Sequence, residues 1–104
     1  MLFRSFYSDT SGNLTAVGNV TAYSDERFKK DISTIDRPLS IVEKCRGVRY
    51  TRRDNNQPGI GVIAQEMQRV IPEVVIENES GKLSVAYGNL VGVLIEAEIG
   101  RAHV

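Results

Sequence analysis

A charged stretch, SDERFKKDI at residues 24–32, divides the chain into two segments of different character. Residues 6–23 read FYSDTSGNLTAVGNVTAY, in which short runs of β-forming residues are separated by a turn-forming cluster and by Gly18. A segment this short and polar cannot bury a core of its own. We therefore expect residues 1–23 to be the end of a repetitive β-structured shaft, and residues 24–97 to form the compact part of the chain.

The apolar pattern predicts an α+β fold built from short strands and helices. Pro38 suits the first turn of a helix that Gly47 would stop, and Pro72 would end a second helix. The expected helices lie at residues 38–46, at 64–70 and from about residue 87 onward. The expected strands lie at residues 14–17, 19–23, 48–52 and 60–63, with a hairpin formed by 74–76 and 83–85.

The dividing stretch itself predicts one short helical turn. Ser24 or Asp25 suits the position before a helix, where a side-chain oxygen accepts a hydrogen bond from the first backbone N–H groups. Phe28 and Ile32 lie four positions apart, so they would share a face if the turn continued.

Both ends of the chain match a common sequencing-library adapter when they are translated back into DNA. Residues 98–104 can be written GAG ATC GGA AGA GCA CAC GTC, and residues 1–5 can be written GTG CTC TTC CGA TCT. Because the matches lie at opposite ends, we expect both segments to be adapter-derived. The only histidine of the sequence, His103, lies in the second segment, so histidine-based catalytic triads lose their candidate base.

Charge and hydropathy limit the kinds of partner that the chain can have. Lys plus Arg and Asp plus Glu number 13 each, so no overall field attracts nucleic acid or a membrane surface. The basic residues Arg49, Arg52 and Arg53 leave a nucleic-acid-binding module as one hypothesis, although a solvated strand face or a trimer contact explains them better. The longest apolar run, residues 90–95, is too short to span a bilayer.

The sequence predicts no metal site and no cofactor. Cys45 is the only cysteine, so it cannot form an internal disulfide, and we expect a small buried apolar side chain. Neither a P-loop, a Rossmann glycine pattern nor a Cys/His metal spacing is present.

Ser24 and Lys29 form the one pairing that suggests nucleophilic chemistry. A serine hydroxyl attacks a carbonyl only when a base takes its proton. Positions five apart on an ideal helix are about 140° out of register, so Ser24 should precede the turn with Lys29 reaching back to it. A lysine has an ordinary pKa of about 10.4, and it serves as a base near neutral pH only where burial or neighbouring cations lower that pKa. The residues alone leave a capped, charged surface turn as the alternative.

Four blocks of sequence, in this order, resemble a known family. SDERFKKDI is similar to the motif that opens the intramolecular chaperone domains of phage tail spikes and tail fibres, the endosialidase-type auto-processing domains. GVIAQE, PEVV and LSVAYGNL, which begin at residues 61, 72 and 83, resemble the later blocks of that family. The resemblance covers roughly residues 18–97. An animal myelin regulatory factor carries a similar domain, but the Gly- and Thr-rich lead-in is more like a phage fibre.

This resemblance implies a domain that forms a homotrimer, helps the upstream fibre of the same chain to fold, and then releases itself. Carried over by position, the scissile bond is Tyr23–Ser24, Ser24 is the nucleophile, Lys29 is the base, and Asp25 and Arg27 have supporting roles. The domain would act once, as a Ser-Lys peptidase on its own chain, with an oxyanion stabiliser that the sequence does not identify. It would belong to a virion tail fibre precursor made in the cytoplasm of a bacterial host, with no nucleic-acid or membrane partner.

The alternative function is a structural trimerisation cap that stays attached to the fibre. The family usually closes with a long coiled-coil helix, of which only the first turns, at about residues 87–97, are expected in this chain. Trimer assembly and cleavage both depend on that helix if assembly orders the site.

Overall fold

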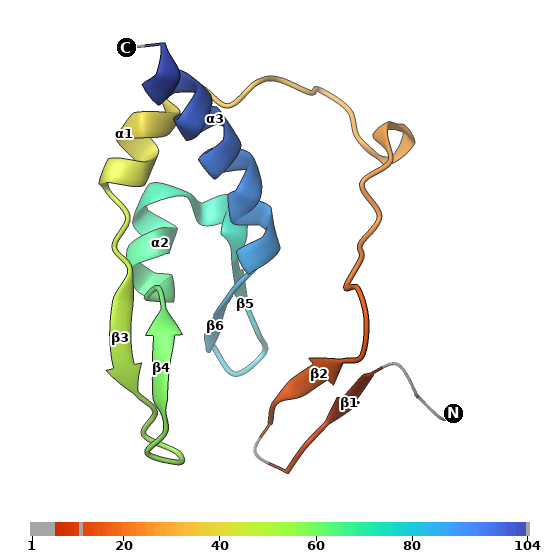
Figure 1. The fold of residues 1–104 in the computed structure, drawn as a ribbon, viewed down its shortest axis with the longest axis vertical. Coiled ribbons are helices and arrows are strands. Elements are labelled where there is room, and N and C mark those ends of the chain that lie inside the picture. Colours follow the sequence, from red (N-terminus) through yellow and green to blue (C-terminus); the bar gives the residue numbers. More distant parts are fainter. Residues whose placement is uncertain (1–5, 11, 104) are drawn as a thin grey trace. The chain divides into compact units, whose positions relative to one another are not determined.

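The computed structural model describes residues 6–10 and 12–103, which form short antiparallel strands and helices (Figure 1). The predicted α+β class is therefore confirmed. Contacts along the chain divide it into two compact units, Met1–Ser33 and Thr34–Val104. Ser24 and Lys29 belong to the first unit, and the three α-helices belong to the second.

The first unit begins with a small hairpin. Strand β1 (Phe6–Ser8) pairs antiparallel with β2 (Leu14–Ala16). In the turn between them the Asn13 backbone N–H donates to Asp9 Oδ1 at 2.9 Å. The expected strand at residues 19–23 is wrong, because this segment has no regular structure. A strand needs a neighbour for its N–H and C=O groups, and β1 is already paired with β2.

The predicted helical turn is present as a single turn of 3-10 helix, η1 (Glu26–Phe28). The next residue, Lys29, has an extended backbone at φ −124° and ψ 147°. The expectation that Phe28 and Ile32 share a helical face is therefore wrong, and both side chains are exposed. The turn forms because Asp25 accepts a hydrogen bond from the Arg27 backbone N–H. It does not extend into a longer helix because no apolar stripe continues beyond it to pack against the rest of the chain.

The second unit consists of three helices, two hairpins and two further 3-10 turns. Along the chain these are α1 (Pro38–Glu43), β3 (Val48–Thr51), β4 (Pro58–Gly61), α2 (Ala64–Val70), η2 (Pro72–Val74), β5 (Val75–Glu77), β6 (Leu83–Val85), η3 (Tyr87–Asn89) and α3 (Leu90–Ala102). Strand β3 pairs antiparallel with β4, and β5 with β6. The predicted helix at residues 64–70 and the predicted hairpin, present as β5–β6, are confirmed. The strands expected at residues 48–52 and 60–63 are present as β3 and β4, and their pairing was not predicted.

Helix α1 ends earlier than predicted. Its last residue is Glu43, and the Lys44 N–H bonds to the carbonyls of Ile41 and Val42. Gly47 is therefore not the residue that stops the helix. At the other end of the unit, α3 continues through residues 98–102, and the adapter origin of that segment stays a prediction.

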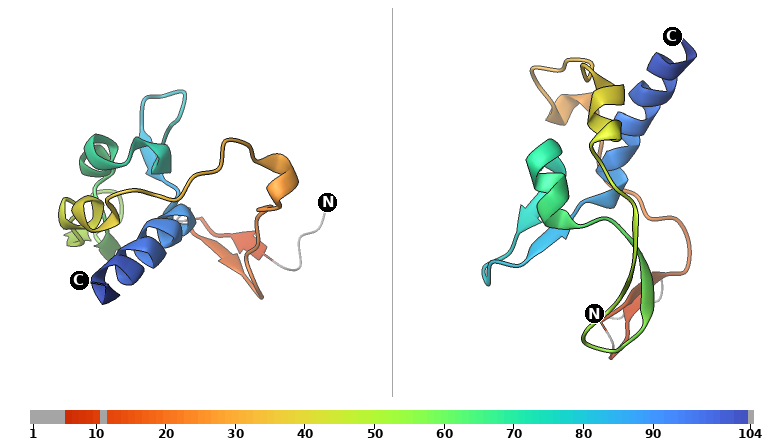
Figure 2. Two further views of the ribbon diagram at one scale, coloured as in Figure 1. Left: turned by 90° about the horizontal axis from the view of Figure 1, so that it is seen from above. Right: turned by 90° about the vertical axis from the view of Figure 1, so that its left-hand side faces the viewer.

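A small apolar core lies between the helices of the second unit. Helix α1 packs along α3, and α2 lies beside them (Figure 1). The buried side chains are Met67, Ile71, Val74, Val93 and Ala97. The β3–β4 hairpin projects away from α1 and α3 (Figures 1 and 2). Among the described residues, no helix combines the length and the apolar composition that a membrane crossing requires.

A tyrosine hydroxyl fixes the end of the β3–β4 hairpin. The Val62 N–H donates to Tyr87 Oη at 3.3 Å. A Cβ atom on the neighbouring Gly61 would lie 2.5 Å from the same oxygen. Only a glycine at position 61 lets η3 approach the hairpin this closely.

We expect Gly61→Ala to lower the free energy of unfolding by about 1–3 kcal/mol, because the new methyl group would collide with Tyr87 Oη. Urea denaturation would measure the change. Removal of the hydroxyl in Tyr87→Phe should relieve the collision, so Gly61→Ala should cost clearly less in that background. An equal loss in both backgrounds would show that the hydroxyl is not the cause.

Candidate active site

The structure brings Ser24 and Lys29 into direct contact. Lys29 Nζ donates a hydrogen bond to Ser24 Oγ at 2.6 Å. Ser24 lies in a segment without regular structure before η1, and Lys29 is the first residue after that turn. The turn therefore folds the chain back, so that the lysine reaches the serine as the spacing predicted. Their catalytic role stays a prediction.

Asp25 and Arg27 hold the turn in shape. Asp25 Oδ1 accepts from the backbone N–H of Arg27 at 2.9 Å and from its Nε at 3.0 Å, and Oδ2 accepts from Nη2 at 2.8 Å. These side-chain and backbone hydrogen bonds lower the pKa of Asp25, and the same carboxylate raises the pKa of Arg27. Both charges are thus engaged with each other. This pairing stabilises the turn that brings Lys29 to Ser24, and the supporting roles expected for Asp25 and Arg27 stay a prediction.

We expect acid to release this cap. The pKa of Asp25 in the folded turn lies below its ordinary value of 3.8. The stabilisation that the ionised carboxylate gives to the turn is therefore complete above pH 3.8, and it is lost as the pH falls through the lower, folded pKa. NMR titration of the Asp25 carboxyl carbon and the Arg27 N–H, in a Ser24→Ala chain that stays intact, would follow the loss. Asp25→Asn should abolish the Arg27 response. A titration midpoint at or above 3.8 would contradict the pairing.

Sequence reasoning missed an aromatic contact beside the site. The rings of Tyr23 and Phe28 are stacked, with centroids 5.9 Å apart and planes 8° from parallel. Tyr23 supplies the carbonyl of the Tyr23–Ser24 bond. The available signal was the spacing, because Tyr23 to Phe28 spans the same five positions as Ser24 to Lys29.

Two residues singled out elsewhere in the sequence, Arg52 and Cys45, have partners of their own. Arg52 pairs with Asp54 at 2.7 Å, and this hydrogen bond lowers the pKa of Asp54. Cys45 is half-buried, its Sγ donates to the Ile41 carbonyl at 3.3 Å, and burial raises the pKa of its thiol, which makes a reactive thiolate unfavourable. Within the described ranges no group of three or more His, Cys, Asp or Glu side chains is placed to hold a metal ion.

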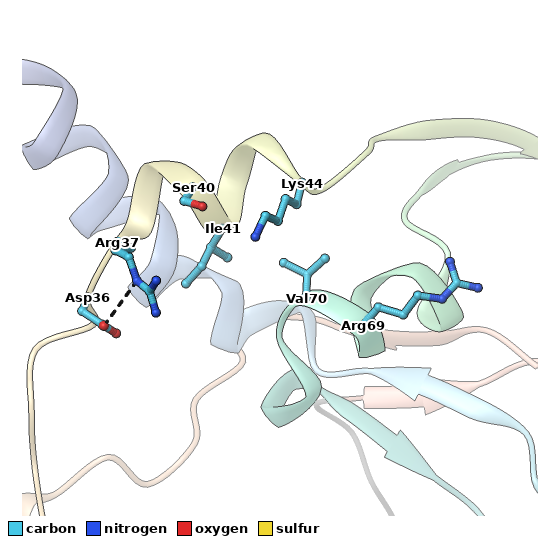
Figure 3. A pocket seen from close by; sticks show the side chains of 7 residues that line it. All are labelled: Asp36, Arg37, Ser40, Ile41, Lys44, Arg69 and Val70. Atoms are coloured by element: carbon cyan, nitrogen blue, oxygen red, sulfur yellow. Dashed lines mark ion pairs between the residues drawn. The ribbon is translucent and has the colours of Figure 1, made fainter.

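A basic hollow of about 250 Å³ lies in the second unit, between α1 and the end of α2 (Figure 3). Arg37 and Lys44 lie on opposite sides of Ile41, and Arg37 Nε pairs with Asp36 Oδ2 at 3.7 Å. The remaining lining residues are Ser40, Arg69 and Val70. The hollow contains none of the residues predicted to be catalytic. One of its cations is partly neutralised by an acid, which weakens its attraction for an anion.

Comparisons with known proteins identify the family of the chain. A family model described as "Chaperone of endosialidase" matches residues 24–76, slightly more than half of the chain, and its match begins at Ser24. The name of this model also classes the family among peptidases.

Three similar curated proteins share one description, long tail fibre protein Gp37. The chain is 34% identical over 88 residues to the protein of Enterobacteria phage K3, 32% over 89 residues to that of Escherichia phage AR1, and 30% over 99 residues to that of Salmonella phage S16. The matches cover 76%, 76% and 81% of this chain, but only 7%, 8% and 13% of the respective relatives. The family expected from the sequence is confirmed: the chain belongs to the chaperone of endosialidase family.

Proposed function

We propose that this chain is the intramolecular chaperone of a phage tail fibre, and that it releases itself by cutting the Tyr23–Ser24 bond. The observation that carries the proposal is the 2.6 Å hydrogen bond between Lys29 Nζ and Ser24 Oγ. It lies directly after the proposed scissile bond, at the residue where the family match begins. The names of the relatives support a fibre as the substrate of the chaperone and a virion as its destination.

The reaction follows from the position of the nucleophile. Lys29, as a neutral amine, takes the proton of Ser24 Oγ, and Oγ attacks the carbonyl carbon of Tyr23 through a five-membered ring. The new C–O bond replaces the C–N bond, and the proton on Lys29 passes to the leaving α-nitrogen of Ser24. Water then adds to the resulting ester, Oγ leaves with a proton, and the products are a Tyr23 carboxylate and a chain that begins with Ser24.

The proton on Lys29 separates the resting site from the reactive one. In the structure the amine donates to the hydroxyl, whereas a base must accept from it. Ser24 and Lys29 are both exposed in the single chain, and water stabilises a charged ammonium group. Covering of this turn by the assembled fibre would remove water and favour the neutral amine. We therefore infer that cutting follows assembly.

Helix α3 supports assembly as a homotrimer. Outside the segment expected to be adapter-derived, its apolar side chains Val91, Leu94 and Ile95 are 52–58% exposed. They line the side of α3 that faces away from the buried Val93 and Ala97. An apolar stripe of this kind on one helix is typical of a coiled-coil seam, and three copies of α3 would bury it. The precursor would assemble in the host cytoplasm, without a nucleic-acid or membrane partner.

Intact mass spectrometry of the purified chain, paired with a measurement of its size in solution, tests the proposal. A trimeric sample should yield two products, residues 1–23 and a fragment that begins with Ser24. A trimer that stays uncut would contradict self-cleavage and favour the alternative, a structural cap that remains attached to the fibre.

A further inference from the structure

We propose that Phe28 is a positioning residue for the cut: its ring holds Tyr23 and thereby makes the site selective for an aromatic side chain before the scissile bond. This inference rests on the self-cleavage proposed above. It concerns the acyl side of the bond, whereas Ser24 and Lys29 act from the other side.

Two contacts close the same turn, one on each side of the bond. Ser24 is held by Lys29, and Tyr23 is held by Phe28 through rings that lie 8° from parallel. Both pairs span five positions and are offset from each other by one residue. The backbone of η1 supports both, since the Phe28 N–H bonds to the Asp25 carbonyl at 3.1 Å and the Lys29 N–H to the Glu26 carbonyl at 3.0 Å.

Tyr23 needs such a contact because its own backbone provides little restraint. The segment that leads to it, residues 17–23, has no helical or strand hydrogen bonding, and the Tyr23 side chain is 93% exposed. Parallel rings with centroids 5.9 Å apart fall in the range of favourable offset stacking. Among the described residues, this is the ring contact that the structure gives Tyr23.

The geometry of the attack explains why this contact would matter for rate. Ser24 Oγ reaches the carbonyl of the preceding residue through a ring of five atoms. The carbonyl plane is set by rotation of Tyr23, and the hydroxyl is set by Lys29. When both partners are held, the reacting atoms need less reorganisation. A stack of this kind corresponds to a change in rate on the order of 3- to 10-fold.

Single-turnover rates of cutting, followed by intact mass, test the inference. Phe28→Ala and Tyr23→Ala should each slow the cut by roughly 3- to 10-fold, and the double variant should be no slower than either single one, because both remove the same contact. Phe28→Trp should restore most of the rate that alanine loses. Ile32→Ala is the matched control, because it removes an equally exposed apolar side chain from the same unit without touching the stack.

A second readout does not depend on activity. In a Ser24→Ala chain, which stays intact, the ring protons of Tyr23 should show an upfield NMR shift that disappears in Phe28→Ala and persists in Ile32→Ala. Cutting by Phe28→Ala at the wild-type rate, or additive effects of the Tyr23 and Phe28 substitutions, would overturn the positioning role and leave self-cleavage standing. A wild-type trimer that stays uncut would overturn both proposals.

Discussion

Replacement of Ser24 by alanine is expected to leave the chain uncut. The substitution removes the oxygen that we propose attacks the Tyr23 carbonyl, and loss of a nucleophile typically slows such reactions by about a thousandfold or more. Replacement of Lys29 by methionine should have nearly the same result, because the base contributes on the order of 100- to 10,000-fold and methionine keeps much of the length of the side chain. Intact mass over time would record both effects.

Lys30→Met is the matched control for the base. It removes a neighbouring exposed ammonium group, whereas the hydrogen bond to Ser24 comes from Lys29. The control chain should be cut at close to the wild-type rate. Cutting of Ser24→Ala at the same bond would show that another group is the nucleophile. Equal loss in Lys29→Met and Lys30→Met would point to net charge rather than to a specific base.

The second large effect is expected on the exposed face of α3. Ile95 is 52% exposed in the single chain, so Ile95→Asp should leave the fold of the monomer intact. In a trimer joined along α3, each copy would lose about 2 kcal/mol of apolar burial and would have to desolvate a carboxylate. We expect a monomer by sedimentation, with helix content unchanged by circular dichroism, and no cut.

Gln68→Asp is the control for this substitution. It adds one negative charge at an exposed position of α2, away from the apolar stripe of α3, and it should stay trimeric and be cut. A trimeric Ile95→Asp chain would exclude this face of α3 as the interface. A monomeric chain that is still cut would show that cutting does not require assembly.

Predictions made from local sequence agreed with the structure where a few neighbouring residues decide the outcome. Helix α2 spans the predicted residues 64–70, because an apolar repeat runs between a preceding strand and Pro72, and both signals lie within one segment. The approach of Lys29 to Ser24 has the same origin. A single capped turn separates them, so the spacing alone nearly determines that the two side chains meet.

Predictions that required a partner elsewhere in the chain were wrong or were not made. Residues 19–23 have the composition of a strand, but β1 is already paired with β2, and strand composition does not create a partner. The contact of Tyr87 with Gly61 joins segments on either side of the β5–β6 hairpin. No local sequence pattern predicts this contact, because it forms only when the core packs and brings the two segments together.

The sequence by itself determined the family, the α+β class, and the turn that joins Ser24 to Lys29. The order of the motifs indicated the family, the spacing of apolar residues indicated the class, and one capped turn of a few residues indicated the contact. Only the tertiary structure decided that Phe28 faces Tyr23 rather than Ile32, that α1 ends at Glu43, and that α3 keeps an apolar face outside the core. The physical reason is that side-chain packing and exposure depend on which surfaces contact each other in space. A local pattern of residues does not specify those contacts.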